Sequence, residues 1–142
     1  MALASDLNAL CDWLHTRIGV HVAIGRPDKA LPGVYIWPWR VVASPAFPTA
    51  GSKGQLIPHI APLNVYFLLL ATPAVTPEGL SNLESAQQEL FDHPVFNTDG
   101  AQFQVITDTS ITVSDLAAVF TAAKLELTIC FAYVLQSSAS QP

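Results

Sequence analysis

Apolar residues near the start of the chain recur at helical spacing. They stand three or four positions apart, at Leu3, Leu7, Leu10, Leu14 and Ile18. This spacing places them on one face of a helix, with Cys11 beside the stripe. Ser5 can cap the N-terminus of such a helix, and Gly19 can end it. The pattern predicts an amphipathic helix over residues 5–18.

The next part of the chain has the pattern of strands separated by turns. Residues 20–24 alternate and predict a short strand. Residues 34–42 are rich in β-forming side chains, but Pro38 cannot donate a backbone hydrogen bond, so this strand lies at an edge or carries a bulge. Residues 63–71 are apolar except for Asn64, and this pattern predicts a central strand buried on both faces. Between them, residues 43–62 contain four prolines and predict a long irregular loop.

The second half of the chain carries two helix starts. Thr76 followed by Pro77 has the pattern of an N-cap and a first helical residue. The inner face of that helix is predicted to hold the residues Leu80, Leu83, Gln87, Leu90 and Phe91. Further on, Thr112 and Asp115 can form a capping box that opens a short helix up to Ala123.

Two more strands complete the predicted fold, one near residues 101–107 and one at the end of the chain. The last is marked by strict alternation, with one face formed by Leu125, Leu127, Ile129, Phe131 and Tyr133. Helices and strands mix without a steady βαβ rhythm, which predicts the α+β class. We expect a single domain over residues 1–136, with a mixed, mostly antiparallel sheet packed by two to three helices, and a flexible tail over 137–142.

The chain carries little charge for its size. Only 12% of its 142 residues are Asp, Glu, Lys or Arg, against about 25% in ordinary soluble domains. Hydrophobic residues make up 51%. A surface with so few charged groups is favourable when copies of the chain or partner proteins cover part of it. The composition therefore favours a protein that works in an assembly.

The charge pattern also excludes some classes of partner. Six basic residues are spread along a chain of net charge −5, so we expect no tight binding of nucleic acid. The longest apolar run, residues 65–71, is far shorter than the ~20 residues that a membrane-spanning helix needs. The first residues lack the pattern of a signal peptide. We therefore expect a cytoplasmic protein with no membrane span.

Motifs for catalysis, cofactors or metals are missing from the sequence. The four histidines, His15, His21, His59 and His93, include no pair at a spacing that binds zinc. Cys11 and Cys130 lie in apolar segments and are interpreted as buried free thiols rather than a disulfide. Residues 51–54 only faintly resemble a phosphate loop. We expect no enzymatic activity, no cofactor and no metal.

Three aromatic residues stand out in the strand over 34–42. Tyr35, Trp37 and Trp39 alternate and share one face. They either pack in the core against the N-terminal helix or form an aromatic patch for a partner, since Trp and Tyr are common interface anchors. The neighbouring Phe47 and the proline-rich loop favour contact with another chain. The residues proposed for an interface are Tyr35, Trp37, Trp39, Arg40, Phe47, Lys53 and His59.

The order of segments resembles a known family. The N-terminal helix is followed by the β-rich segment 34–47, the proline-flanked apolar strand 61–72, a helix ending in residues 90–96, and the segments 114–116 and 127–134. This order is similar to that of the cap, or tail-terminator, family of contractile injection systems. These are phage-tail-like particles such as the antifeeding prophage and the Photorhabdus virulence cassettes.

The resemblance implies a structural protein without enzymatic activity. Family members form a ring with sixfold symmetry that closes the top of the inner tube and the last layer of the sheath. By this resemblance, we expect a homohexamer whose partners are the inner tube protein and the sheath protein. The proline-rich loop is then a candidate arm that reaches a neighbour, because proline lowers the entropy lost on ordering.

Two other functions remain open at this stage. The first is a phage head–tail completion protein of the same α+β type, which would sit at the portal and touch DNA. The second is a small ligand-binding or hydrolytic domain. That function would require a concave pocket with a titratable group whose pKa is perturbed.

Overall fold

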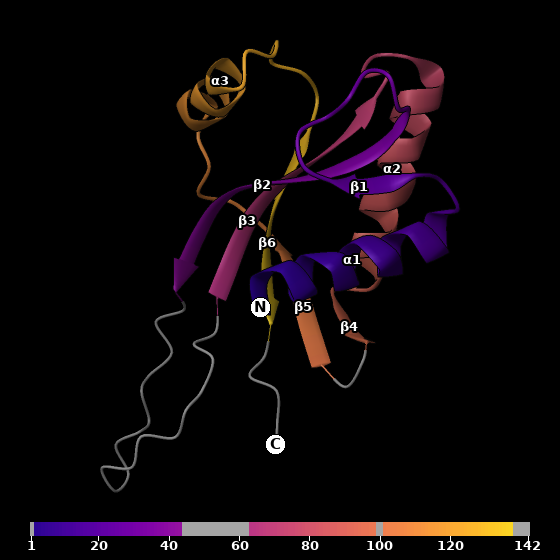
Figure 1. Ribbon diagram of the computed structural model, residues 1–142, viewed down its shortest axis with the longest axis vertical. Helices are drawn as coiled ribbons and strands as arrows, with labels where there is room; N and C mark the ends of the chain where they lie inside the picture. Colours follow the sequence, from indigo (N-terminus) through magenta and orange to yellow (C-terminus); the bar gives the residue numbers. More distant parts are fainter. Residues whose placement is uncertain (1, 44–62, 99–100, 138–142) are drawn as a thin grey trace, which may run out of the picture.

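The computed structural model describes residues 2–43, 63–98 and 101–137. Within these residues, three helices and six strands follow one another (Figure 1). Their order and bounds are α1 Ala2–Ile18, β1 Val22–Ile24, β2 Gly33–Ala43, β3 Leu63–Thr72, α2 Pro77–Asp92, β4 Val95–Thr98, β5 Ala101–Thr107, α3 Val113–Ala122 and β6 Phe131–Ser137. The predicted loop over 43–62 and most of the predicted tail lie outside the described residues.

The strands form one sheet in the order β1-β2-β3-β6-β5-β4. Only β1 and β2 are parallel, and every other pair is antiparallel. The α+β class and the mostly antiparallel mixed sheet are therefore confirmed. Pro38 coincides with a shift of register between β2 and β3, and β1 pairs with β2 only over residues 34–36. Of the two expected alternatives, the bulge is found; β2 is not an edge strand, because it lies between β1 and β3 in the sheet.

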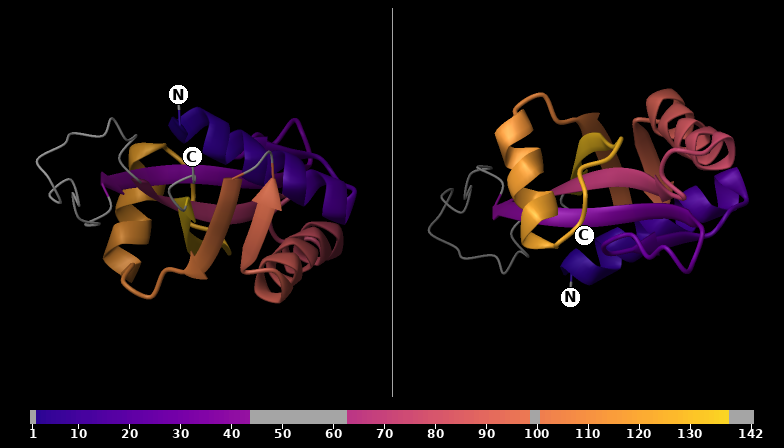
Figure 2. Two further views of the ribbon diagram at one scale, coloured as in Figure 1. Left: turned by 90° about the horizontal axis from the view of Figure 1, so that it is seen from below. Right: turned by 90° about the horizontal axis from the view of Figure 1, so that it is seen from above.

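Strand β3 carries the core on both of its faces. Val65, Phe67 and Leu69 face the cluster to which α1 and α2 contribute. The alternate residues Leu68 and Leu70 face a second cluster built around Phe120 of α3. Figure 2 shows α1 and α3 on opposite sides of β2 and β3. The apolar run predicted such two-sided burial, and this prediction is confirmed.

Two predictions about the helices need correction. Helix α1 begins at Ala2, so Ser5 lies inside the helix and does not cap it. Helix α2 is capped by Thr76 as expected, but Leu80 and Phe91 are 38% and 73% exposed. Leu83 and Leu90 are buried as predicted, and Gln87 is half-buried. Gly79 and Ala86 complete the buried face. The small residues Gly79 and Ala86 let α2 approach its neighbours closely, and this rotates the larger apolar residues outward.

The final strand is shorter than predicted, and one strand was missed. β6 begins at Phe131, and residues 124–130 lie outside the sheet. Leu127 and Ile129 are 52% and 49% exposed, so the alternation does not place them in the core. The missed strand, β4, covers only residues 95–98 and pairs with β5 alone. It is too short to show a periodic pattern. The capping box of Thr112 and Asp115 at the start of α3 is confirmed.

Replacing Gly79 by Ala tests the close approach of α2. Alanine is favoured over glycine in helices by about 1 kcal/mol. A Cβ atom at this position, however, would lie 1.8 Å from the carbonyl oxygen of Pro73, which is backbone. We therefore expect Gly79→Ala to lower the free energy of unfolding measured by urea denaturation. The control Ser81→Ala, at an exposed position of the same helix, should be neutral or slightly stabilising. A stabilised Gly79→Ala protein would contradict this packing.

Burial of Tyr133 in β6 makes the stability of the protein depend on pH in alkaline solution. Burial raises the pKa of Tyr133 to about 12, and its ring packs on Phe67 with centroids 5.6 Å apart. In the unfolded chain the phenol titrates near pH 10. Stability is thus complete below about pH 10 and is lost as the pH rises towards 12, because the unfolded state releases its proton first. Tyr133→Phe should weaken this loss in urea denaturation between pH 8 and 11. Tyr66→Phe should change it less, and equal curves for all three proteins would contradict the assignment.

Candidate interaction surface

The aromatic side chains of β2 pack on the face covered by α3. Trp37 meets Phe120 of α3 edge-on, with ring centroids 5.3 Å apart. Trp39 lies next to Tyr66 of β3 in the same manner, at 6.2 Å. The expectation that these residues share one face is confirmed. The helix that covers them is α3 and not the N-terminal helix, because alternation along β2 turns Val34 and Ile36 towards α1.

Tyr35 differs from the two tryptophans. It is only 3% exposed, and its hydroxyl donates hydrogen bonds to the backbone oxygens of Leu31 and Asp28. The hydroxyl of Thr72 donates to the same Leu31 oxygen at 3.2 Å. These bonds fix the turn before β2 against the end of β3. In the described chain Tyr35 is therefore a core residue that positions this turn.

Arg40 is the most exposed member of the proposed interface within the described residues. Its guanidinium carbon lies 4.9 Å from the centre of the Tyr66 ring. It follows the shift of register at Pro38, beside Trp39, which is half-buried. We define the aromatic strip as Trp37, Trp39, Arg40 and Tyr66. The other three proposed residues, Phe47, Lys53 and His59, lie outside the described residues.

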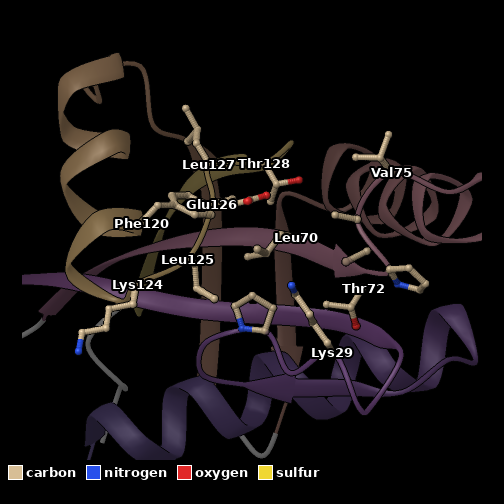
Figure 3. A pocket seen from close by; sticks show the side chains of 14 residues that line it. Lys29, Leu70, Thr72, Val75, Phe120, Lys124, Leu125, Glu126, Leu127 and Thr128 are labelled. Carbon is tan, nitrogen blue, oxygen red and sulfur yellow. The ribbon is translucent and has the colours of Figure 1, made fainter.

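A groove of about 600 Å³ continues from the aromatic strip along the α3 face (Figure 3). Phe120 joins the two features, because it touches Trp37 and also lines the groove. The walls come from the end of β3 and the turn after it, the end of α3, and the segment that leads to β6. The lining residues are Pro27, Lys29, Leu70, Ala71, Thr72, Pro73, Ala74, Val75, Phe120, Lys124, Leu125, Glu126, Leu127 and Thr128.

The groove exists because several residues separate the end of α3 from the start of β6, where the chain rejoins the sheet. Strand β6 pairs with β3 only over residues 64–69 of β3, so residues 70–72 pair with β2 alone. The segment 124–130 begins at Lys124, whose φ is +60°, and crosses from α3 back to the sheet. The backbone of residues 126–129 makes no hydrogen bond within the described part of the chain. One wall of the groove is thus a segment whose backbone groups have no hydrogen-bond partner among the described residues.

Basic side chains gather at the groove. Lys29 and Lys124 belong to its lining, and Arg26 donates a hydrogen bond to the Ala123 oxygen at 3.1 Å. These three are half of the six basic residues of the whole chain. Figure 3 shows Lys29 pointing into the groove and Lys124 pointing outward from its rim. Glu126 is the acidic residue of the lining. Sequence reasoning missed this site, because Lys124 is almost 100 positions from Arg26 and Lys29.

Groups with a shifted pKa lie elsewhere in the molecule. Burial raises the pKa of both cysteine thiols, and Cys11 and Cys130 are free, as the sequence predicted. These thiols and Tyr133 are absent from the groove lining. Among the described residues, no group of three His, Cys, Asp or Glu side chains is placed to hold a metal ion. None of the described helices has the length and apolar character needed to cross a membrane.

His93 and His15 serve local structural roles. His93 caps α2, and its backbone N–H donates to the Glu89 oxygen at 2.9 Å. Its ring lies 3.1 Å from a terminal nitrogen of Arg17, whose Nε lies 2.6 Å from Oε1 of Glu89. This group ties α1 to α2 away from the groove. His15 contacts the Val20 oxygen through Nδ1 at 2.7 Å.

Comparison with known proteins identifies the fold through solved structures. No protein-family model and no curated protein sequence matches the chain. The PVC sheath/tube terminator of an extracellular contractile injection system, in the extended state, superposes with a TM-score of 0.71. The match has 14% sequence identity and covers 96% of this chain and 56% of that one. The tube-terminating cap of the anti-feeding prophage has a TM-score of 0.69 at 14% identity, covering 99% and 55%.

The two matches cover similar shares of this chain and of the matched terminators. Almost the whole of this chain superposes, whereas it spans little more than half the length of either terminator. At this identity the likeness shows the architecture and not the individual residues. The chain therefore has the terminator fold of contractile injection systems, as the order of its segments predicted.

Proposed function

We propose that this chain is a structural cap, or tail terminator, of a contractile phage-tail-like particle. It forms a ring on the end of the inner tube and sheath and so ends their growth. The observation that carries the proposal is the superposition of nearly the entire chain on two caps, at TM-scores of 0.71 and 0.69. The residues of those proteins that lie beyond the superposed part play no role in the proposal.

The surface supports a role in assembly. Several large apolar side chains are strongly exposed, including Val113 at 75%, Phe91 at 73%, Val75 at 71%, Leu31 at 53% and Leu127 at 52%. A chain with 12% charged residues has few ionic groups to separate them. Burial of such side chains against other subunits removes apolar area from water, which is the main driving force of association. The chain is thus suited to permanent contacts within a particle and not to catalysis.

A cap also imposes an energetic requirement. It must bind the end of a tube while offering no surface on which the next tube subunit can add. Contacts around a closed rotation are head-to-tail, and about 800 Å² per partner is usual for a stable contact. We expect six copies in the ring, from the resemblance of the sequence to the cap family. The partners are the tube and sheath proteins, and the ring assembles on them in the cytoplasm.

The aromatic strip is the proposed contact with the tube or the sheath. Trp and Arg are the residues most enriched at energetically dominant interface positions. Trp37 and Trp39 are half-buried and Arg40 is exposed, so their outer surfaces are accessible in one copy. Phe47, Lys53 and His59 follow Arg40 in the sequence within residues 44–62, and we keep these three in the proposed contact.

Addition of the purified chain to polymerising tube and sheath proteins tests this function. Electron microscopy should show shorter particles, each with a ring at one end. Trp37→Ser with Trp39→Ser, and separately Arg40→Glu, should raise the concentration needed for capping at least tenfold. Arg40 is exposed, so its reversal should leave stability within about 0.5 kcal/mol of the original.

A matched charge reversal provides the control. Asp12→Lys changes an exposed residue of α1 and should cap as the original chain does. Particles of unaltered length without terminal rings would refute the cap function. If the strip variants cap normally, the function stands and the assignment of the strip is wrong.

A further inference from the structure

Two features of the surface are complementary and lie far apart on one chain. One is the groove beside β3. The other is the exposed end of α2, which we call the α2 knob: Phe91, Asp92, Pro94 and Val95. We propose that the groove of one copy receives the α2 knob of the next, and that this contact closes the ring. This inference rests on the proposed cap function and identifies the contact between sister subunits.

The α2 knob is an apolar projection. Phe91 is 73% exposed, although it stands next to Leu90, which is 3% exposed. Val95, at the start of β4, is 43% exposed, and Pro94 between them is also exposed. A large aromatic residue with apolar neighbours at a helix end is a typical anchor for a concave apolar site. The helix has no packing role for this side chain within the described part of the chain.

The α2 knob cannot reach the groove of its own chain. Val75, which lines the groove, stands just before α2, whereas Phe91 is near the other end of that helix. A helix of 16 residues is about 24 Å long. In Figure 1 the segment between α3 and β6 lies at the upper end, and the C-terminal end of α2 lies towards β4 below. Complementary surfaces at separate places produce a head-to-tail contact, which gives a ring when the rotation closes.

The charged residues of the groove and of the α2 knob are complementary. Lys29 and Lys124 flank the apolar lining of the groove, where Glu126 is the acidic member. Asp92 in the α2 knob is exposed and accepts a hydrogen bond from the Gln88 side-chain amide at 3.0 Å. Arg17 forms its salt bridge with Glu89, at 2.6 Å, and not with Asp92. An acidic, apolar knob therefore meets an apolar groove with a surplus of basic side chains.

The size and walls of the groove fit this occupant. A volume of about 600 Å³ lies within the usual range for sites that enclose a ligand, roughly 300–1,000 Å³. It has room for the ring of Phe91 together with Val95. The wall over residues 126–129 has no internal backbone hydrogen bonds, so the knob displaces water without breaking an existing ladder.

The decisive experiment mixes two disabled variants. Phe91→Ser removes the anchor of the knob, and Leu127→Glu places a charge in the groove at a position that is 52% exposed. Each variant alone should remain a monomer by light scattering. Their mixture should form a one-to-one dimer, because one intact knob and one intact groove remain between them. Val113→Ser, at an equally exposed site on α3, should assemble like the original chain.

Charge reversal gives an independent readout. Asp92→Lys, and separately Lys29→Glu with Lys124→Glu, should each weaken self-association at least tenfold. The two sets combined in one chain should restore it, because the attraction is then reversed in sign and preserved. If the original chain is monomeric in solution, the same variants are scored by ring formation on tube ends.

Several results would overturn the inference. Normal rings from Phe91→Ser or Leu127→Glu, or a mixture that does not pair, would show that copies meet elsewhere. Groove variants that keep the ring but lose the tube or sheath would assign the groove to a segment of that partner. In all these cases the cap function survives. If the original chain neither forms rings nor binds tube ends, the cap function itself fails.

Discussion

The two-sided burial of β3 is the constraint on which the rest of the structure depends. Its ten residues lie between β2 and β6, and from Val65 onward nearly all of them are buried. Because alternate side chains enter different clusters, α1 and α2 must cover one face and α3 the other. The α3 face is completed by only one short helix, and this leaves the end of β3 beside an open groove.

The groove and the aromatic strip are two results of the same arrangement. Helix α3 covers Trp37 through Phe120, and the same Phe120 forms part of the groove lining. Beyond α3 the chain must cross back to the sheet, and it pairs with β3 only from Phe131 onward. The crossing segment therefore exposes apolar side chains that a longer strand would have buried. The α3 face of the sheet therefore leaves more apolar surface exposed, and this surface is available for the proposed contacts with other subunits.

The proposed assembly accounts for exposed apolar side chains that would be unfavourable in an isolated protein. Exposed Phe91, Val75 and Val113 gain stabilisation only when another chain covers them. The scarcity of charge lowers the cost of desolvation at such contacts, since few ionic groups must be stripped of water. The terminator fold provides a rigid sheet on which these surfaces are held at separate ends.

The sequence by itself determined the elements whose signals are local. The helical stripe of α1, the Thr76 and Thr112 caps, the bulge at Pro38 and the two-sided burial of β3 all depend on neighbouring residues, and all were predicted. The order of these elements was also sufficient to identify the fold.

Only the tertiary structure decided which apolar residues remain exposed to solvent. Phe91 has helical spacing and Leu127 has strand spacing, yet both are exposed. Spacing shows which residues share a face, but not whether the fold has another element to cover that face. Lys29 and Lys124 both line the groove, although they are 95 positions apart in the sequence. No local pattern predicts that they line the same groove. Their arrangement follows from the point at which β6 joins β3, which is set by the packing of the whole sheet.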